Sequence, residues 1–548
     1  MDAGSITDAL TNALLPINRL PPEILIYIFS MCRDERPVHV RGPARWPFRR
    51  YSTHTLEPAL SVCRHWRDIA LSTPSLWNSI VNSSAIHRQF SRSLGVPIDV
   101  HVVTGFSTEM AQWCLNVQSH IREMHIGDFR GALTLDQVDK LLYFLKITTA
   151  DQLEHLKIDL PASILPLWSR TPLFPLFSGR GRRLRSLCLA HVSFLPSTLF
   201  PSLVRFVLSD PAGPSSRNGR QTWSMTDLIR FLAGSPRLQE LYLCGINMIA
   251  RSETLSTPLP SIELPKLWQF VFDVSGSNED LMASSVRTIT SAIRTRPSCH
   301  RFFAPFEMDL ELSGGEPLDA MLSTMSGGAT LTSVRIDFAG AMKFLRMSGD
   351  TSGSITVIPR GPQTVLWDGL SDLFTLSSLF ADVEELWISL RADQWAFLRQ
   401  YSPIFTWFPK LKRLFITHSP RKLTFDTFVH DPEFGGLQEL MDPLTVNADG
   451  TMGCPLLETL CINLPAHVTD VRPLAQMLAS RAGTRPIRNV VIGYDPELEL
   501  EVLADVFVLD QLVEELVIEE IPEASHTSSS WLFSVPVAFQ PPYSFRRN

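Results

Sequence analysis

Several features are missing from this 548-residue sequence. It contains no uninterrupted apolar run of the roughly 18 residues that a membrane-spanning helix needs, so we expect no membrane segment. Its first residues include Asp2 and Asp8 and lack a basic stretch followed by an apolar one, so a secretory signal is not expected. The net charge of −7 argues against nucleic-acid binding, which favours a basic surface.

Cysteine is also sparse, with eight residues that never pair as C-x-x-C. A small secreted disulfide scaffold would carry them far more densely. Cysteine and histidine do not cluster at the spacing of a zinc site, so we expect no metal. We therefore predict reduced, packed thiols in a cytoplasmic or nuclear protein.

Catalytic signatures are absent as well. The sequence contains no G-x-S-x-G elbow, P-loop, G-x-G-x-x-G or H-E-x-x-H. The segment 179–183 combines glycine with positive charge but lacks the strand-then-helix context of a phosphate-binding loop, so we interpret it as a turn. Acidic residues near the carboxyl terminus alternate with apolar ones, which is typical of solvated faces. We therefore expect neither catalysis nor a cofactor.

What the chain does have is apolar material. Apolar residues make up 45% and charged residues 19%, which is enough to build a large core and excludes disorder for most of the length. A chain of this length accommodates several small domains, or one small module followed by a long array.

An apolar stripe with helical spacing marks the amino-terminal region. It consists of Leu20, Ile24, Leu25, Ile28 and Phe29. Pro21 and Pro22 suit the first turn of a helix, where their missing N–H groups cost little. A second helical face follows, made of Ala59, Val62, Cys63, Trp66, Ile69 and Ala70. Helices this short cannot bury both faces by themselves, so a partner or the rest of the chain must cover them.

Residues 33–56 separate these two helical patterns. Six arginines alternate there with proline and glycine, which predicts an exposed loop. We interpret it as a solvated insertion, and contact with an acidic partner or a nuclear address are the functional alternatives.

From about residue 96 one short pattern recurs, apolar-x-x-apolar-x-apolar, and each copy predicts a strand. The copies lie at 97–102, 121–126, 153–158, 184–189, 203–208, 238–243, 267–272, 331–336, 383–388, 411–416, 457–462 and 513–518. A recurring local pattern indicates a repeat architecture. The segment 337–382 gives a weak signal and is interpreted as an inserted loop.

Helical patterns lie between the predicted strands. Ser224 and Asp227 predict a capping box, and Gly234 a helix end. Strands that alternate with helices form a parallel sheet, and units that contact only their neighbours stack into a curved solenoid. We expect an α/β fold with a tail at 1–15, a helical module at 16–80, a solenoid over 96–523 and a loose tail at 524–548.

Three consecutive blocks of the helical module resemble an F-box. They are Leu20-Pro21-x-Glu23-Ile24-Leu25-x-x-Ile28-Phe29, Leu60-x-Val62-Cys63-Arg64-x-Trp66-Arg67-x-Ile69-Ala70 and Pro74-x-Leu76-Trp77. The resemblance covers residues 16–80 and departs from the family in the basic insert at 33–56. Large inserts there are familiar in fungal-type members.

The remainder resembles divergent leucine-rich repeats, although the asparagine that usually follows each strand is mostly missing. Together the two resemblances imply a substrate-receptor subunit of an SCF-type cullin–RING ubiquitin ligase. The F-box would bind the Skp-type adaptor and, through it, the cullin–RING ligase, while the repeats bind an unknown protein substrate. The alternative is a non-catalytic interaction scaffold that acts outside ubiquitination.

The resemblance implies a set of adaptor contacts, and the residues themselves suggest a substrate surface. Carried over by position, the adaptor contacts are Leu20, Pro21, Ile24, Leu25, Ile28, Val62, Cys63, Trp66 and Trp77. Some of them, Trp66 above all, equally fit the module's own core. On the repeats, Tyr242, Trp387 and Phe415 occupy strand positions that point away from the helices, and aromatic residues of this kind anchor interfaces. The alternative is that a loop or the tail covers this face.

Overall fold

In the computed structural model the chain forms two compact units. Among the residues described, unit 1 consists of those up to Leu267 together with Ala292–Arg294, and unit 2 consists of the others. The structure describes residues 15–33, 56–81, 86–93, 95–103, 105–127, 134–160, 173–192, 194–209, 223–244, 260–273, 289–296, 298–307, 331–337, 344–349, 353–360, 380–391, 405, 407–419, 437–464, 470–494 and 506–520.

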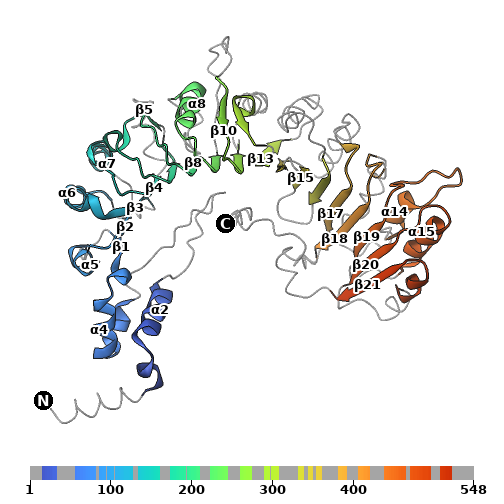
Figure 1. Ribbon diagram of the computed structural model, residues 1–548, viewed down its shortest axis with the longest axis horizontal. Helices are drawn as coiled ribbons and strands as arrows, with labels where there is room; N and C mark the ends of the chain where they lie inside the picture. Colours follow the sequence, from blue (N-terminus) through green and yellow to red (C-terminus); the bar gives the residue numbers. More distant parts are fainter. Residues whose placement is uncertain are drawn as a thin grey trace. The chain divides into compact units, whose positions relative to one another are not determined.

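Unit 1 begins with a helical module (Figure 1). Its elements are η1 (Pro16–Arg19), α2 (Pro22–Arg33), α3 (Glu57–Val62), α4 (Arg64–Ser72) and η3 (Pro74–Trp77). Helix α2 starts at Pro22, as predicted, because the first position of a helix needs no N–H donor. The same holds for Pro74 at the start of η3, which follows Thr73.

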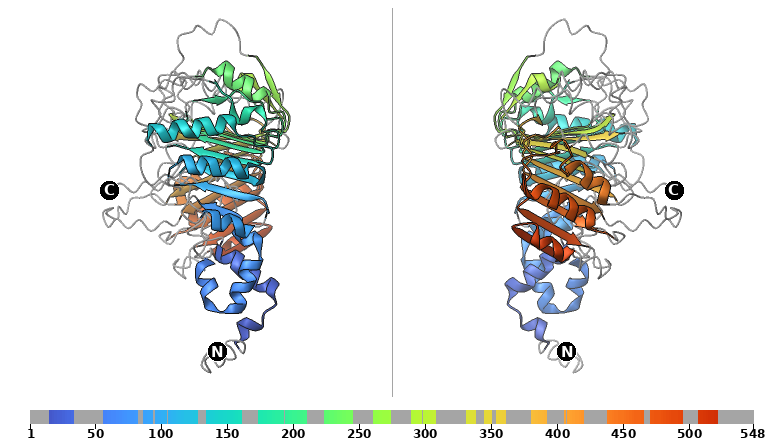
Figure 2. Two further views of the ribbon diagram at one scale, coloured as in Figure 1. Left: turned by 90° about the vertical axis from the view of Figure 1, so that its left-hand side faces the viewer. Right: turned by 90° about the vertical axis from the view of Figure 1, so that its right-hand side faces the viewer.

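A parallel sheet follows in unit 1, in the order β1-β2-β3-β4-β6-β8-β9. Its strands are β1 (Ser79–Val81), β2 (Ile98–Val102), β3 (Ile121–Ile126), β4 (His155–Asp159), β6 (Ser186–Ala190), β8 (Arg205–Ser209) and β9 (Glu240–Cys244). The connecting helices include α5 (Ile86–Ser93), α6 (Thr108–Val117), α7 (Leu135–Ile147) and α8 (Met225–Ala233). These helices lie on the same side of the strands (Figure 1), and α6 and α7 stack one above the other (Figure 2).

Smaller elements complete unit 1. They are η4 (Gln118–His120), η6 (Leu176–Gly179), and the two-stranded pairs of β5 (Leu173–Phe174) with β7 (Leu195–Pro196) and of β10 (Ile262–Leu264) with β12 (Ile293–Thr295).

Local hydrogen bonds explain where the connecting helices begin. The Ser224 hydroxyl accepts from the Asp227 N–H, and the Asp227 carboxylate accepts from the Ser224 N–H, so the predicted capping box is present. Thr134 and Gln137 form the same arrangement at the start of α7. Such caps satisfy donors that have no partner inside a helix.

Unit 2 contains a second set of strands, in the order β11-β13-β16-β15-β14-β17-β18-β19-β20-β21. They are β11 (Gln269–Asp273), β13 (His300–Glu307), β14 (Ser333–Asp337), β15 (Phe344–Gly349), β16 (Gly353–Arg360), β17 (Glu385–Arg391), β18 (Arg413–Ser419), β19 (Thr459–Leu464), β20 (Asn489–Tyr494) and β21 (Glu515–Glu520). Pairing is parallel except at β15, which runs antiparallel to both neighbours.

The helices of unit 2 among these residues are α14 (Leu437–Met441), η10 (Asp442–Leu444), α15 (Arg472–Ala482) and η11 (Val508–Gln511). Helices α14 and α15 lie beside β18–β21 (Figure 2). The segment 337–382, interpreted from sequence as a loop, supplies β15 and β16. The sequence pattern missed them because an antiparallel insertion does not repeat the motif of the parallel strands.

A turn with the same hydrogen bond precedes most of the predicted strands. The first apolar residue of the motif lies in this turn, and its N–H donates to the carbonyl three residues earlier, as in Leu184 to Gly181 (3.2 Å) and Leu411 to Phe408 (3.1 Å). Residues in this position are Leu153, Leu184, Leu203, Leu238, Leu267, Val383, Leu411 and Leu457. All of them are buried. Each copy of the motif therefore coincides with a strand, but most of these strands begin about two residues after the first residue of the motif.

A second recurring contact keeps neighbouring strands in register. The carbonyl before one strand accepts two N–H groups from the next, as Arg185 does from Val204 (2.7 Å) and Arg205 (2.9 Å). Glu384 accepts in the same way from Lys412 and Arg413, both at 2.9 Å. Unit 1 and unit 2 therefore share one local strand geometry.

The helical module joins the sheet with a single residue between them. Strand β1 begins at Ser79, and Asn78 alone separates it from Trp77. The Asn78 carbonyl accepts from the Asp99 N–H of β2 (2.8 Å), and the Arg92 guanidinium of α5 lies 4.5 Å from the centre of the Trp77 ring. The sheet thus begins before residue 96, the predicted boundary. The prediction missed β1 because a three-residue strand is too short to show the motif.

Three sequence predictions lie outside the described residues: the tail at 1–15 except Leu15, the basic insert except Arg33 and Leu56, and the tail at 524–548. No helix in the described part of the chain has the length and apolar character needed to cross a membrane. Within the same residues, no group of three or more His, Cys, Asp or Glu side chains is placed to hold a metal ion.

Candidate functional site

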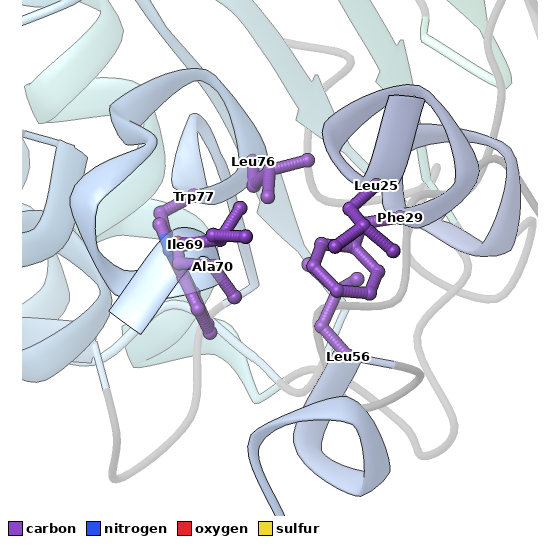
Figure 3. Packing of buried hydrophobic residues seen from close by; sticks show 7 residues of the cluster. All are labelled: Leu25, Phe29, Leu56, Ile69, Ala70, Leu76 and Trp77. Atoms are coloured by element: carbon purple, nitrogen blue, oxygen red, sulfur yellow. Dashed lines mark hydrogen bonds between the residues drawn. The ribbon is translucent and has the colours of Figure 1, made fainter. Parts of the chain in front are cut away.

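The helical module has a small core of its own. Leu25 and Phe29 of α2 lie with Leu56 on one side, and residues from α4 and η3 lie on the other (Figure 3). The latter are Ile69, Ala70, Leu76 and Trp77. The Trp77 indole N–H donates to the Ala70 carbonyl (2.7 Å), which satisfies its one polar group inside this core.

The predicted adaptor contacts divide by burial. Leu25 is 0% and Trp77 1% exposed, so these two belong to the core of the module and offer no surface to a partner. This corrects the sequence interpretation for both residues. The helical spacing placed Leu25 in the apolar stripe, and the resemblance supplied Trp77, but neither shows which side chains the module itself covers. Leu20, Ile28 and Trp66 pack against the core and are partly buried, and Cys63 is half-buried. Pro21, Ile24 and Val62 are exposed.

Trp66 has a structural position. Its ring packs edge-on against Phe29, with centroids 5.3 Å apart, and its indole N–H donates to the Asn18 side-chain oxygen (2.6 Å). It therefore ties η1 and α2 to α4, which agrees with the alternative that it forms part of the module's core.

The outward side of α2 carries three exposed apolar side chains. Ile24 is 45%, Tyr27 64% and Met31 60% exposed. Their spacing of three and four residues places them on one helical face, which we call the α2 outer face. Tyr27 and Met31 were missed from the sequence, although this second spacing was visible beside the first stripe.

Two further apolar residues, Leu15 and Ile17, are exposed just before α2, at 46% and 42%. Soluble proteins seldom gather this many large apolar side chains on one short exposed segment unless a partner binds there. The module thus has a closed core on one side and an apolar surface on the other.

Residues 17–83 match the protein-family model described as F-box-like. The match covers the helical module from the second residue of η1 onward, together with β1. No curated protein matches the chain significantly. The resemblance deduced from the three sequence blocks is thereby confirmed for the F-box-like domain, and the α2 outer face is a surface of that domain.

The second candidate surface is the side of the sheet that faces away from the helices. In unit 1, strand register aligns a row of side chains there, which we call the unit 1 row: His101, His125, Lys157, Cys188, Val207 and Tyr242. The equivalent row in unit 2, the unit 2 row, contains Trp387, Phe415, Cys461, Val491 and Val517. Of the predicted substrate residues, Tyr242 lies in the unit 1 row, and Trp387 and Phe415 lie in the unit 2 row.

Five of the six side chains in the unit 1 row are buried, and Lys157 is half-buried. Cys188 is 6%, Val207 4% and Tyr242 4% exposed. The Tyr242 hydroxyl lies 3.3 Å from a carboxylate oxygen of Glu240. Tyr242 therefore has no open surface for a substrate, which corrects its predicted role. The strand pattern gives the face on which Tyr242 lies but not whether that face is exposed.

Ionisable groups accompany the unit 1 row. Arg205 forms a two-point ion pair with Glu240, with one contact at 2.7 Å. Burial alone would lower the pKa of Arg205, but the hydrogen bond and charge of Glu240 raise it above its ordinary value. The rings of His101 and His125 stack with centroids 4.5 Å apart. Burial lowers the pKa of His125 well below 6.5, and the charges of Lys157 and His155 lower it further.

The unit 2 row is half-buried and apolar. The Trp387 and Phe415 rings stack in parallel, with centroids 3.4 Å apart. The Trp387 indole N–H donates to Glu385, whose carboxylate also accepts from Arg413 (2.8 Å). Cys461 and Val491 are half-buried, and Val517 is 38% exposed. Trp387 and Phe415 therefore retain accessible surface, which Tyr242 lacks.

Proposed function

We propose that this protein is the substrate-receptor subunit of an SCF-type cullin–RING ubiquitin ligase. In this role the F-box-like domain binds a Skp-type adaptor, which connects it to the cullin–RING ligase, and the sheet binds a protein substrate. The observation that carries the proposal is the α2 outer face, an exposed apolar surface on a domain that matches the F-box-like family model.

The strand and helix succession supports a binding role for the rest of the chain. We propose that the repeated turns and parallel strands form a divergent leucine-rich-repeat solenoid, in which each strand adds one set of side chains to an extended binding surface. The protein would contribute binding and positioning, while the chemistry of ubiquitin transfer belongs to its partners. All eight cysteines are free, which supports a reducing compartment. We propose that the protein acts in the cytoplasm or nucleus.

Adaptor binding is tested with Tyr27→Asp. A charge in the centre of the α2 outer face would be desolvated on binding, so we expect the affinity for a purified Skp-type adaptor to fall about tenfold or more, measured by calorimetry. Tyr143→Asp is the matched control, because Tyr143 of α7 is 65% exposed against 64% for Tyr27. It should leave the affinity unchanged.

Core residues are unsuitable for this test. A substitution such as Leu25→Asp would bury an unpaired charge and unfold the module, so loss of binding would not report on the surface. If the intact chain does not bind the adaptor, the proposal is wrong. If the chain binds the adaptor but the pair does not recruit a cullin, the protein acts as a scaffold outside ubiquitination.

A further inference from the structure

The carboxylates at the β21 end of unit 2 lie beside its apolar row. Glu515 and Glu519 flank Val517 on the same side of strand β21, because side chains two residues apart share a face. Both are exposed, and within the described part of the chain neither side-chain carboxylate makes a hydrogen bond or an ion pair. Their charge is therefore available to a partner.

Among the described side chains beside the unit 2 row, a further carboxylate is already paired. Glu385 pairs with Arg413, its register neighbour on β18. The positions between that pair and β21 are uncharged, with Thr459 and Asn489 in one flanking row and Thr417, Asn463 and Gly493 in the other. The surface thus changes from aromatic at β17–β18 to acidic at β21.

The Cys461 thiol lies close enough to two of these carboxylates for their charges to act on its pKa. Burial raises its pKa to about 11, and the charges of Glu519 and Glu385 contribute in the same direction. Cys461 lies between Phe415 and Val491 in the row. The carboxylate of Glu519 is therefore near enough to influence the apolar part of the surface.

We infer that the face formed by Phe415, Cys461, Val491 and Val517 binds an extended segment of a partner protein that carries apolar side chains followed by lysine or arginine. The apolar side chains contact the row, and the basic ones pair with Glu515 and Glu519. Trp387 stacks against the Phe415 ring and limits its movement. Under the proposed ligase function, on which this part of the inference rests, the segment belongs to the substrate.

Geometry sets the length of the segment. Neighbouring strands lie roughly 4.8 Å apart, so the three spacings from β18 to β21 cover roughly 14 Å, which about five extended residues span. A second copy of this chain fits less well, because its own face carries the same carboxylates and the chain has a net charge of −7.

The test selects from a random library of displayed peptides of roughly eight residues, using the full-length protein as bait. We expect enriched peptides to place lysine or arginine after apolar residues. Their affinity should fall about three- to tenfold for the double variant Glu515→Lys/Glu519→Lys, which loses two exposed ion pairs. Phe415→Ala should reduce it about tenfold, as for other aromatic anchors.

Glu458→Lys is the control, because it makes the same kind of substitution once, at an exposed position just before β19, with the strand parity of Leu460 and Ile462 on the opposite face. It should not alter peptide binding. The double charge reversal should also bind peptides in which the basic residues are replaced by glutamate, which wild type rejects; such a gain does not arise from unfolding.

Four outcomes would overturn the inference: no enrichment, enrichment without basic residues, affinities unaffected by the charge reversal, or a dimer of the chain that buries Phe415 and Val517. None of these depends on the adaptor. Peptide binding without adaptor binding would remove the ligase function and leave the peptide surface in place. Adaptor binding without peptide binding would leave the ligase function in place and remove the peptide surface.

Discussion

In unit 1 the side chains that face away from the helices are buried and accompanied by ion pairs, whereas in unit 2 the equivalent side chains are apolar and half-exposed. The backbone turns, strand register and paired hydrogen bonds are the same in both. The two rows therefore differ in side-chain chemistry and in burial on a similar local backbone. The same strand position contributes to a buried face in unit 1 and to an accessible one in unit 2.

Alanine substitutions at one aromatic residue of each row should give the largest difference in the free energy of unfolding between the two units. Tyr242→Ala removes a buried ring and should lower the free energy of unfolding by about 3 kcal/mol, whereas Phe415→Ala at a half-exposed position should cost about 1 kcal/mol. Denaturant unfolding measures both. Tyr242→Phe, which removes only the hydroxyl contact with Glu240, is the control at about 1 kcal/mol. Equal losses for the two alanine variants would contradict the contrast.

The next contrast compares two Arg–Glu pairs that both join register neighbours. The side chains of Arg205 and Glu240 are 24% and 12% exposed, against 51% and 21% for Arg413 and Glu385. A double-mutant cycle should give a coupling of about 2 kcal/mol for the buried pair and about 0.5 kcal/mol for the exposed one. Added salt should weaken only the second coupling. Similar couplings would mean that burial does not distinguish the rows.

Acid should destabilise unit 1 through His125. Its pKa in the folded state is far below 6.5, because of burial and of Lys157 and His155, even though a Glu123 carboxylate oxygen lies 3.5 Å from Nε2. The unfolded chain therefore takes up the proton first. Stability is complete above the unfolded pKa and falls below it, by at most about 1.4 kcal/mol per pH unit, until the folded pKa is reached.

The replacement His125→Gln should make this decline shallower. Unfolding free energies measured between about pH 7.5 and about pH 5.5 give the comparison. His120→Gln serves as the control, since His120 lies outside the unit 1 row. A decline of the same slope in wild type and His125→Gln would show that other groups cause it.

The last comparison concerns the alkylation rates of two cysteines and involves no change in the free energy of unfolding. Burial raises the pKa of Cys188 to about 12 and that of Cys461 to about 11. Cys461 is also the more exposed of the two. Alkylation followed by mass spectrometry should therefore modify Cys461 about tenfold faster or more. The reverse order would show that the unit 2 row is covered in solution.

The strands could be predicted because their apolar spacing is local. The same motif also fits Ile487, Val490 and Ile492, which precede and form β20, so that strand was overlooked rather than hidden. Which side of α2 is exposed could not be deduced, since it depends on Leu56, Leu76 and Trp77 closing over Leu25. The burial of Tyr242 could not be deduced either, because the strand motif is the same on the exposed and the buried faces.

The single residue between Trp77 and β1 has a mechanical consequence. With Asn78 held by the Asp99 N–H and Trp77 beneath Arg92, the junction has little freedom to bend or rotate. A partner protein bound to the helical module would therefore reorient the first strands together with that module. One residue inserted into β1 would move the side chains of this strand to the opposite face of the sheet and change the orientation of the helical module relative to the first strands.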